Sequence, residues 1–506
     1  MKLKLVWTII FVVGLAVRST ELFHPTDTTS WRESDVSSIA RNYYRNGMNF
    51  FYPQIDWGGA GPGYTESEFP IYPYLIALSY KIFGIWEPIG RIISFLFSLG
   101  TMLIFFRFCR YLFNTKTSIA ALFFFAMCPL LMVNSVSIQP EPVMFFFYVL
   151  AAYYFMRWID TQTVKSYILT FVFTAMALLC KITAVNIGIL FVIIIIVRKG
   201  WKFLIKPNVL LLGALSIIPS ILWYFYSHRF YLNYGNSLGL SNEYAWTGWD
   251  FFTNPYFIKG ILKQDVFYIW TFFGPLIFIL ALASSKMLKN RDLIMPVSWL
   301  ISAGMFYLIT SRTTADDWAF YYHIFSVPSV SILLGISSVE IYDRYFALIR
   351  LPVKDSANFL NIVRGRLIVT SLFVLVTLYA AYGIIFMVKK KPGILKTSEL
   401  YSCKNNFSDV IPQKSLILVS AVTSKDDDGY PVAYNASYFF YWLDRKGFSL
   451  CIEDQSLENV LKYKEKGAKY YVAETFAMKQ SIGFEEILRN HFKVAAECNG
   501  VVLFEL

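Results

Sequence analysis

Long apolar runs recur through most of this sequence, and short charged loops separate them. A run of about 20 apolar residues can cross the hydrocarbon core of a membrane as a helix, with its backbone polar groups satisfied internally. Only 16% of the residues are charged and 56% are hydrophobic, whereas soluble chains carry about 25% charged residues. Alternating ten-residue segments, typical of a membrane barrel, do not occur. The sequence therefore predicts a mainly α-helical, multi-spanning membrane protein.

The apolar runs suggest about eleven membrane spans. The first covers residues 5–17 after Lys2 and Lys4, and it resembles a signal peptide without a small-residue cleavage site. We interpret it as an uncleaved first helix with a cytoplasmic N-terminus. A long outside loop is expected at 20–88. The later spans are expected at about 89–113, 118–138, 142–158, 166–184, 185–198, 208–227, 267–285, 293–310, 323–341 and 367–388.

Lysine and arginine gather in the loops expected on the inner side, such as the loop that holds Arg198, Lys199, Lys202 and Lys206. The positive-inside rule explains this pattern, and with it the net charge of +12, better than nucleic-acid binding does. The basic run 389–391 falls outside, where long domains translocate largely regardless of charge. We predict a multi-pass protein of the plasma (inner) membrane with its C-terminal part outside, and no nucleic-acid partner.

The composition becomes that of a soluble protein from about residue 395. The sequence thus predicts a transmembrane domain at 1–394, including the long outer loop, and an extracytoplasmic α/β domain at 395–506. The expected strands are 415–419, 469–472 and 501–504, and a helix at 457–466 should end at Gly467.

Three of the six cysteines, Cys403, Cys451 and Cys498, fall in the C-terminal part. One disulfide is possible among them, and one thiol is then left over. Metal-binding Cys-x-x-Cys spacing does not occur and the four histidines are scattered, so no metal ligands are predicted from the residues.

The segment that follows the first span carries the best candidates for catalysis. It ends in Glu33 and Asp35, and apolar residues continue at helical spacing to Tyr44, which predicts an amphipathic helix along the membrane surface. Glu33 lies three residues after Ser30, as in a capping box, and Asp35 could favour the helix dipole. We favour Asp35 over Glu33 as a general base, with Asp27 third.

Further charged residues fall near the same membrane face. Glu68 precedes a proline-rich turn, and Glu141 lies between two prolines in a short outer turn, where an acid is costly unless water or a partner reaches it. Lys181 ends an apolar run; it either snorkels to the interface or binds a lipid-linked phosphate. Arg312 could also hold a phosphate. His323 either orients a hydroxyl or is a satisfied interfacial histidine.

Several short blocks of the sequence resemble the GT-C glycosyltransferases, specifically the dolichyl-phosphate-mannose protein mannosyltransferase and aminoarabinose transferase group. The resemblance covers about residues 1–340. The blocks that carry it are Trp31-Arg-Glu-Ser-Asp35 through Ile39-Ala-Arg-Asn-Tyr-Tyr, Glu68-Phe-Pro-Ile-Tyr-Pro-Tyr-Leu-Ile-Ala77, Gln139-Pro-Glu141-Pro, Lys181 and Tyr321-Tyr-His-Ile-Phe-Ser-Val-Pro328.

This resemblance implies a GT-C-like fold, a polyprenyl-phosphate sugar donor and a lipid, glycan or protein acceptor on the outer side. The family typically has two adjacent acids in its first outer loop, and the first is catalytic. Alignment on Ile39-Ala-Arg puts Arg32 and Glu33 at that pair, so Glu33 and Asp35 both stay candidates. Some GT-C enzymes need a divalent cation, so such an ion is possible here.

We therefore predict an inverting hexosyl or pentosyl transferase. Asp35 or Glu33 would act as base, Lys181 and Arg312 would bind the departing phosphate, and Glu68 and Glu141 would position the acceptor or an ion. The glycine-rich stretch 58–63 could form a lid. The alternative is a lipid or polysaccharide transporter, but the expected internal repeat is missing.

Overall fold

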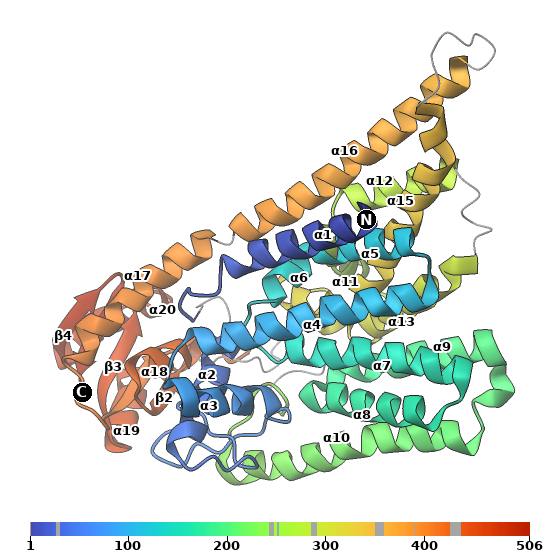
Figure 1. Cartoon of the computed structure of the whole chain (residues 1–506). Helices are drawn as coiled ribbons and strands as arrows, with labels where there is room; N and C mark the ends of the chain where they lie inside the picture. Colours follow the sequence, from blue (N-terminus) through green and yellow to red (C-terminus); the bar gives the residue numbers. More distant parts are fainter. Residues whose placement is uncertain are drawn as a thin grey trace.

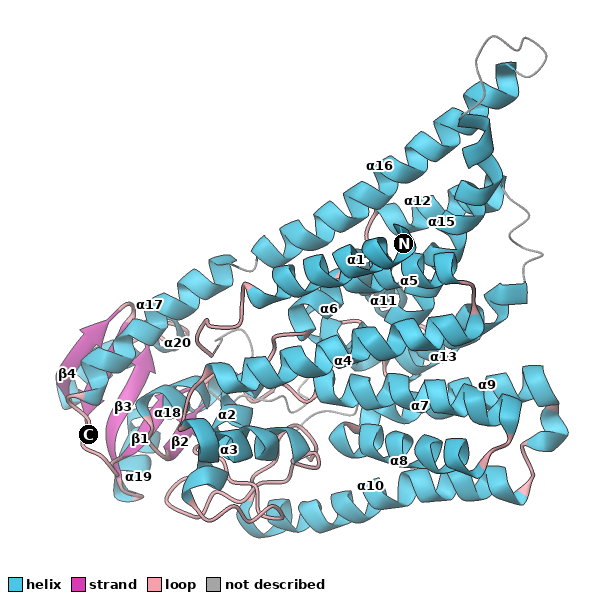
Figure 2. Ribbon diagram, viewed as in Figure 1, coloured by secondary structure: helices cyan, strands magenta, loops and turns pink. Residues whose placement is uncertain are grey.

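The computed structural model describes residues 2–26, 31–241, 247–249, 252–284, 291–349, 359–389, 391–425 and 437–506. Long helices run roughly side by side through most of the molecule, and a small sheet covered by helices lies at one end of them (Figure 1). Figure 2 shows that the strands are confined to that end. Here it is called the sheet end.

Within the described residues, seven helical stretches are long and apolar enough to cross a membrane, and a bent pair could add an eighth. The count of eleven spans remains a prediction. The seven are α4 (Pro88–Leu112), α7 (Glu141–Thr161), η1 (Ile182–Asn186) with α9 (Ile187–Lys199), α10 (Pro207–Tyr234), η6 (Arg291–Leu293) with α13 (Ile294–Ile309), η7 (Asp317–Ser326) with α15 (Val327–Ile349), and α16 (Phe359–Lys389).

The remaining apolar runs form shorter, bent or more polar helices. Helix α11 (Pro255–Asp265) with η4 (Val266–Trp270) meets α12 (Phe273–Ser284) at 84°. The predicted span 118–138 is broken into α5 and α6, because Pro129 cannot donate a backbone hydrogen bond within a continuing helix. The others are α1 (Lys2–Ser19), α5 (Thr115–Ala126), α6 (Pro129–Asn134), α8 (Val164–Cys180), η2 (Trp201–Phe203) and α14 (Ser311–Thr314).

Helix α2 (Trp31–Arg45) corrects the expectation of a helix lying on the membrane surface. Its residues from 33 to 43 are buried, between α3 (Ile71–Phe83) on one side and α18 (Ser437–Leu443) on another. The polar side chains of α2 find partners there: the Ser34 hydroxyl lies 2.7 Å from that of Ser437. Periodicity alone cannot foresee this, because the partners come from the far end of the chain.

The C-terminal sheet has five strands in the order β2-β1-β3-β5-β4. Strands β2, β1 and β3 run parallel, and β5 and β4 are antiparallel to their neighbours. The predicted strands match β1, β3 and β5, whereas β2 and β4 were not foreseen. The strands are β1 (Leu416–Ser420), β2 (Gly447–Leu450), β3 (Ala468–Glu474), β4 (Lys493–Cys498) and β5 (Val501–Glu505).

Helices cover both faces of this sheet. One face shares a hydrophobic core with α17, α18 and residues of the 31–88 segment, such as Ile39 and Trp57. The other face packs against α19 and α21, through Val460 and Leu488. The helices of this part are α17 (Lys391–Ser408), α18, η8 (Ile452–Asp454), α19 (Leu457–Glu465), α20 (Thr475–Met478) and α21 (Phe484–His491).

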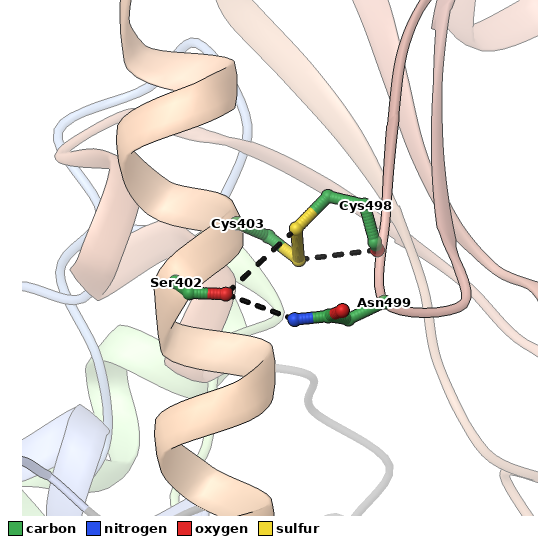
Figure 3. Close-up of a disulfide and its surroundings, with 4 residues drawn as sticks. All are labelled: Ser402, Cys403, Cys498 and Asn499. Atoms are coloured by element: carbon green, nitrogen blue, oxygen red, sulfur yellow. Dashed lines mark hydrogen bonds between the residues drawn. A yellow bond between two sulfur atoms is a disulfide. The ribbon is translucent and has the colours of Figure 1, made fainter.

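A disulfide joins Cys403 of α17 to Cys498 at the end of β4 (Figure 3). It links residues 95 apart in sequence, and the Asn499 amide donates to the Ser402 hydroxyl beside it. Cys451 is a buried free thiol. The expectation of one disulfide with one thiol left over is confirmed, and the disulfide fastens the helix that follows the last apolar span to the sheet.

The glycine-rich stretch 58–63 lies along β2, which is an edge strand of the sheet. The Gly59 N–H donates to the Gly447 carbonyl at 2.7 Å, and the Gly447 N–H donates to the Asp56 carbonyl at 3.0 Å. A Cβ on Gly59 would come within 2.6 Å of the Phe448 ring, so only glycine allows this approach. The stretch thus covers an edge strand, and its role as a lid stays a prediction.

Candidate functional site

A pocket with about 410 Å³ of space, its open mouth included, lies where α2 meets the start of α3. An ion pair spans it: Arg32 Nη1 lies 3.2 Å from Glu68 Oε2 and 3.1 Å from the Leu238 carbonyl. Its lining consists of Arg32, Val36, Ile39, Ser67, Glu68, Phe69, Pro70, Tyr72, Pro73, Pro140, Cys180 and Leu238. The pocket is therefore mostly apolar, with one charged pair.

The segment that carries Glu68 is fastened to α10 and to the chain after it. The Glu66 carboxylate accepts from the Ser237 hydroxyl at 2.6 Å and lies 2.9 Å from His228 Nδ1. The Ser67 carbonyl accepts from the Trp223 indole at 2.9 Å. These contacts hold Glu68 in the pocket wall, so Glu66 is a support for the site.

A second ion pair, between Lys181 and Glu141, lies directly behind this pocket. Both side chains are buried, and the Lys181 ammonium donates to Glu141 Oε1. Their chain neighbours Cys180 and Pro140 line the pocket. Lys181 falls between α8 and η1, where the backbone is extended. The break brings a cation from mid-sequence beside an acid at the first turn of α7.

Two tyrosine rings complete the surroundings of the Lys181 ammonium. The centroids of Tyr321 and Tyr322 lie 5.0 and 4.7 Å from its nitrogen. A cation over an aromatic face is stabilised electrostatically, so the charge of Lys181 is balanced by one carboxylate and two rings. Among the residues that the structure describes, the buried Glu141 Oε2 atom has no hydrogen-bond partner.

Glu33 is held by a buried arginine of α4. Arg91 Nη2 lies 2.8 Å from Glu33 Oε2, and Nη1 lies 3.2 Å from Oε1. The Ile138 backbone N–H also donates to Oε1 at 3.0 Å. Arg91 further donates to the carbonyls of Pro25 and Val136. Glu33 thus ties α2, α4 and the turn before α7 together.

Asp35 lies on another side of α2 and is fully buried. The Trp57 indole N–H donates to Asp35 Oδ1 at 2.9 Å. Neither Asp35 nor Glu33 lines the pocket described above, although Val36 and Ile39 of the same helix do. Asp27, the third candidate, lies outside the described residues.

His323 and Arg312 belong to a separate group near the bent helix pair. His323 Nδ1 lies 2.7 Å from Asp265 Oδ1, and Nε2 lies 2.8 Å from the Thr314 carbonyl. A carbonyl only accepts, so Nε2 is the donor in its contact with Thr314. Arg312, partly buried on α14, is not part of the pocket lining.

Three residues of the site region were not among the predicted site residues: Arg32, Arg91 and Trp57. Arg91 had a signal in the sequence, since it is a charge near the start of a long apolar run. Arg32 falls in the block aligned with the family's acidic pair, but its contact with Glu68 depends on the fold. Trp57 had no signal, because its contact with Asp35 also arises only in the fold. The structure brings Glu68 close to the Glu141–Lys181 pair and leaves His323 with Asp265.

The acids of this region do not form a metal site among the residues that the structure describes. No three His, Cys, Asp or Glu side chains gather there. Glu33, Glu68 and Glu141 are each paired with an arginine or a lysine. Within the described residues, these paired acids therefore do not make up a donor set for a divalent cation.

Several known proteins resemble this chain in sequence or in fold. A sequence model described as dolichyl-phosphate-mannose-protein mannosyltransferase matches residues 67–224. An uncharacterized protein of Aquifex aeolicus (strain VF5) is 27% identical over 293 residues, which is 56% of this chain and 62% of the relative. The matched part of the chain thus spans less than two thirds of that relative's length.

Two solved structures share the fold over nearly the whole chain. ArnT from Cupriavidus metallidurans, bound to undecaprenyl phosphate, matches with a TM-score of 0.63 and 13% identity, covering 98% of this chain and 97% of ArnT. The archaeal oligosaccharyltransferase AglB from Archaeoglobus fulgidus, in complex with an inhibitory peptide and a dolichol-phosphate, gives 0.55 and 12%, covering 95% and 72%.

The fold and the apolar helices define a multi-pass membrane protein with a pocket at the sheet end of its helices. The chain shares the fold of ArnT and AglB, which confirms the predicted GT-C-like fold.

Proposed function

We propose that the chain is a glycosyltransferase that moves a sugar from a polyprenyl-phosphate donor to a lipid, glycan or protein acceptor on the outer face of the plasma (inner) membrane. The observation that carries this proposal is the buried Lys181 ammonium, held by Glu141 and two tyrosine rings directly behind the pocket. A cation in that place can stabilise the charge that develops on a departing phosphate. The bound lipid phosphates of ArnT and AglB support a donor of this class.

Lys181 would gain a second anionic partner during the reaction. In the absence of donor its charge is neutralised by Glu141. When the donor binds, Lys181 would turn to the phosphate oxygens, and Arg32 at the pocket wall would help to hold the acceptor or the phosphate through its exposed edge. Because Lys181 has three donor hydrogens, it can keep Glu141 in place while it contacts a phosphate.

The acceptor hydroxyl would attack the anomeric carbon on the face opposite to the phosphate, with inversion. Its proton would pass to a carboxylate, and the C–O bond to the phosphate would break as the new C–O bond forms. Asp35 is the favoured base, because Arg91 and the Ile138 N–H occupy both carboxylate oxygens of Glu33. Trp57 would orient Asp35 through its indole hydrogen bond.

The orientation in the membrane follows from several features taken together. The pocket, the disulfide and the sheet lie at one end of the helices, and the basic α9–α10 connection lies at the other (Figure 1). Disulfides persist in oxidising compartments, and basic loops face the cytoplasm. We infer that the sheet end is extracytoplasmic.

The test is transfer of labelled sugar from a polyprenyl-phosphate donor by the purified chain in detergent. Asp35→Asn should abolish transfer, and Glu33→Gln provides the comparison for the second candidate. Full activity of both variants would eliminate the proposed base. Activity in detergent also discriminates against the transporter alternative, since a transporter needs a closed compartment to show function.

A further inference from the structure

Another cavity lies between the helices α7, α9 and α13, and it is called the α9–α13 cavity here. It holds about 210 Å³ of space, its open mouth included. Arg198 comes from the last turn of α9, and Ile294 is the first residue of α13. The cavity therefore lies at the helix ends, on the side of the α9–α10 connection and away from the sheet (Figure 1). Its lining consists of Met156, Ile194, Val197, Arg198, Ile294, Met295 and Ser298.

The apolar walls of this cavity continue into the outer surface of the helices. Val197 and Ile294 line the cavity and are 50% and 44% exposed, and Val297 and Ile301 extend the exposed apolar face along α13. Both α9 and α13 belong to stretches long and apolar enough to cross a membrane, so exposed apolar side chains on them contact lipid chains. The cavity is thus open to the lipid and can take part of an acyl chain.

Arg198 is the one charged residue in this lining, and its side chain is 45% exposed. Its Nη1 atom lies 3.9 Å from Asp160 Oδ1, which is too far for a hydrogen bond. The other oxygen of Asp160 accepts from the Tyr111 hydroxyl at 2.9 Å. A guanidinium has five N–H donors in a planar fork, so the exposed part of Arg198 can donate to a ligand in the cavity.

Further cations lie next to Arg198 along the chain. Lys199, Lys202 and Lys206 are exposed, and the sequence from 182 to 242 contains no aspartate or glutamate. Trp201 is 63% exposed, with the Lys202 ammonium 5.9 Å from the centroid of its ring. Basic pockets between membrane helices, and basic clusters next to them, bind anionic lipid headgroups, and tryptophan is enriched at the level of the headgroups.

We propose that the α9–α13 cavity binds an anionic phospholipid, with part of an acyl chain between α9 and α13 and the phosphodiester on Arg198. The guanidinium can donate two parallel hydrogen bonds to phosphate oxygens. The three lysines attract an anionic headgroup and repel the choline cation of phosphatidylcholine, so the site selects by headgroup charge. A lipid bound there joins the inner ends of α9 and α13, which are far apart in the sequence.

Photo-crosslinking tests the proposal without reference to any activity. The full chain, with benzoylphenylalanine in place of Ile294, is reconstituted in vesicles of equal amounts of phosphatidylglycerol and phosphatidylcholine with the same acyl chains. After irradiation, mass spectrometry gives the ratio of the two lipid adducts. The control probe replaces Phe225, which is 75% exposed on α10. Two charge variants are compared at both probe positions: Arg198→Gln, and Arg229→Gln near the other end of α10, where the arginine is also exposed.

We expect phosphatidylglycerol adducts at position 294 several-fold above phosphatidylcholine adducts, and a ratio near one at position 225. Arg198→Gln should bring the ratio at 294 down to that at 225, whereas Arg229→Gln should leave it unchanged. Equal ratios at the two positions, or equal effects of the two charge variants, would overturn the proposal. Crosslinked pairs of chains in place of lipid adducts would overturn it as well, because a second copy would then cover the cavity. These outcomes do not depend on whether the chain transfers sugar.

Discussion

Arg41 of α2 and Asp56 of the following loop form a buried ion pair, with 2.7 Å between Nη2 and Oδ2. The same guanidinium donates to the Tyr441 carbonyl at 2.7 Å and lies 3.1 Å from Asp444. Asp56 is the neighbour of Trp57, which holds Asp35. One side chain thus joins the C-terminal region to the helix and the loop that position the proposed base.

Removal of Arg41 should destabilise the contact between these regions. Arg41→Ala leaves Asp56 buried without its counter-charge, which costs about 3–5 kcal/mol. Arg45→Ala is the matched control. Arg45 also lies on α2 and pairs with Asp444, but both of these side chains are exposed. The expected loss is therefore at most about 1 kcal/mol. Unfolding in detergent measures both. Equal losses would contradict a special role for Arg41.

The contact between Arg41, Arg45 and Asp444 should weaken in acid. Burial opposes ionisation of Asp444, but the hydrogen bond from Arg45 and the charges of Arg41, Arg45 and Arg445 outweigh it, so its pKa lies below the ordinary value. A carboxyl with a lowered pKa contributes stability at neutral pH, and this contribution is lost as the pH falls through that pKa.

The stability difference between the wild type and Asp444→Asn should therefore be present at pH 7, begin to fall near the ordinary carboxyl pKa of about 4, and disappear only below the lowered pKa of Asp444. Thermal unfolding in buffers across this range measures the difference. A difference that stays constant over the whole range would contradict the ion-pair explanation.

Loss of the Lys181 charge should reduce the rate of sugar transfer, and it should also lower stability by about 3–5 kcal/mol because Glu141 is left buried without its counter-charge. Lys181→Met removes the proposed phosphate contact, and we expect a loss of about 10²–10³ in kcat. Lys263→Met removes the exposed pair with Asp317 and should leave the rate unchanged. Single-turnover transfer from the polyprenyl-phosphate donor measures both variants. A Lys181→Met enzyme of normal rate would contradict the role in leaving-group stabilisation.

Glu33→Gln should act mainly on stability. The substitution leaves Arg91 buried without a carboxylate partner, for which we expect a loss of about 3–5 kcal/mol in unfolding experiments. If instead the variant is as stable as the wild type but inactive, Glu33 has a chemical role and Asp35 loses its preference.

Thiol labelling tests the cysteine assignments. Without reduction, the unfolded chain should take up four labels, at Cys109, Cys128, Cys180 and Cys451, and after reduction six. In the folded protein Cys451 should react slowly, because burial raises its pKa to about 12 and the thiolate is the reactive form. Mass spectrometry of the alkylated chain counts the labels, and six labels without reduction would exclude the Cys403–Cys498 disulfide.

The sequence by itself determined the class of fold and the candidate residues of the site. Apolar runs of membrane-spanning length depend only on local composition, so nearly all of them correspond to helices in the structure. The strands β1, β3 and β5 are local in the same sense, since each is a short run of apolar residues with a recognisable end. Lys181 and Glu141 stood out because charges next to apolar runs are costly.

Only the tertiary structure decided which of these residues meet. The Lys181–Glu141 pair, the Arg91–Glu33 pair and the Trp57–Asp35 hydrogen bond join segments 40, 58 and 22 residues apart, and no local pattern encodes such distances. The burial of α2 was likewise decided by the tertiary structure. Its periodicity predicted a helix on the membrane surface, but the C-terminal region covers it. Local patterns set the elements, whereas the pairing of buried charges depends on how those elements pack, because a buried charge is stable only beside its partner.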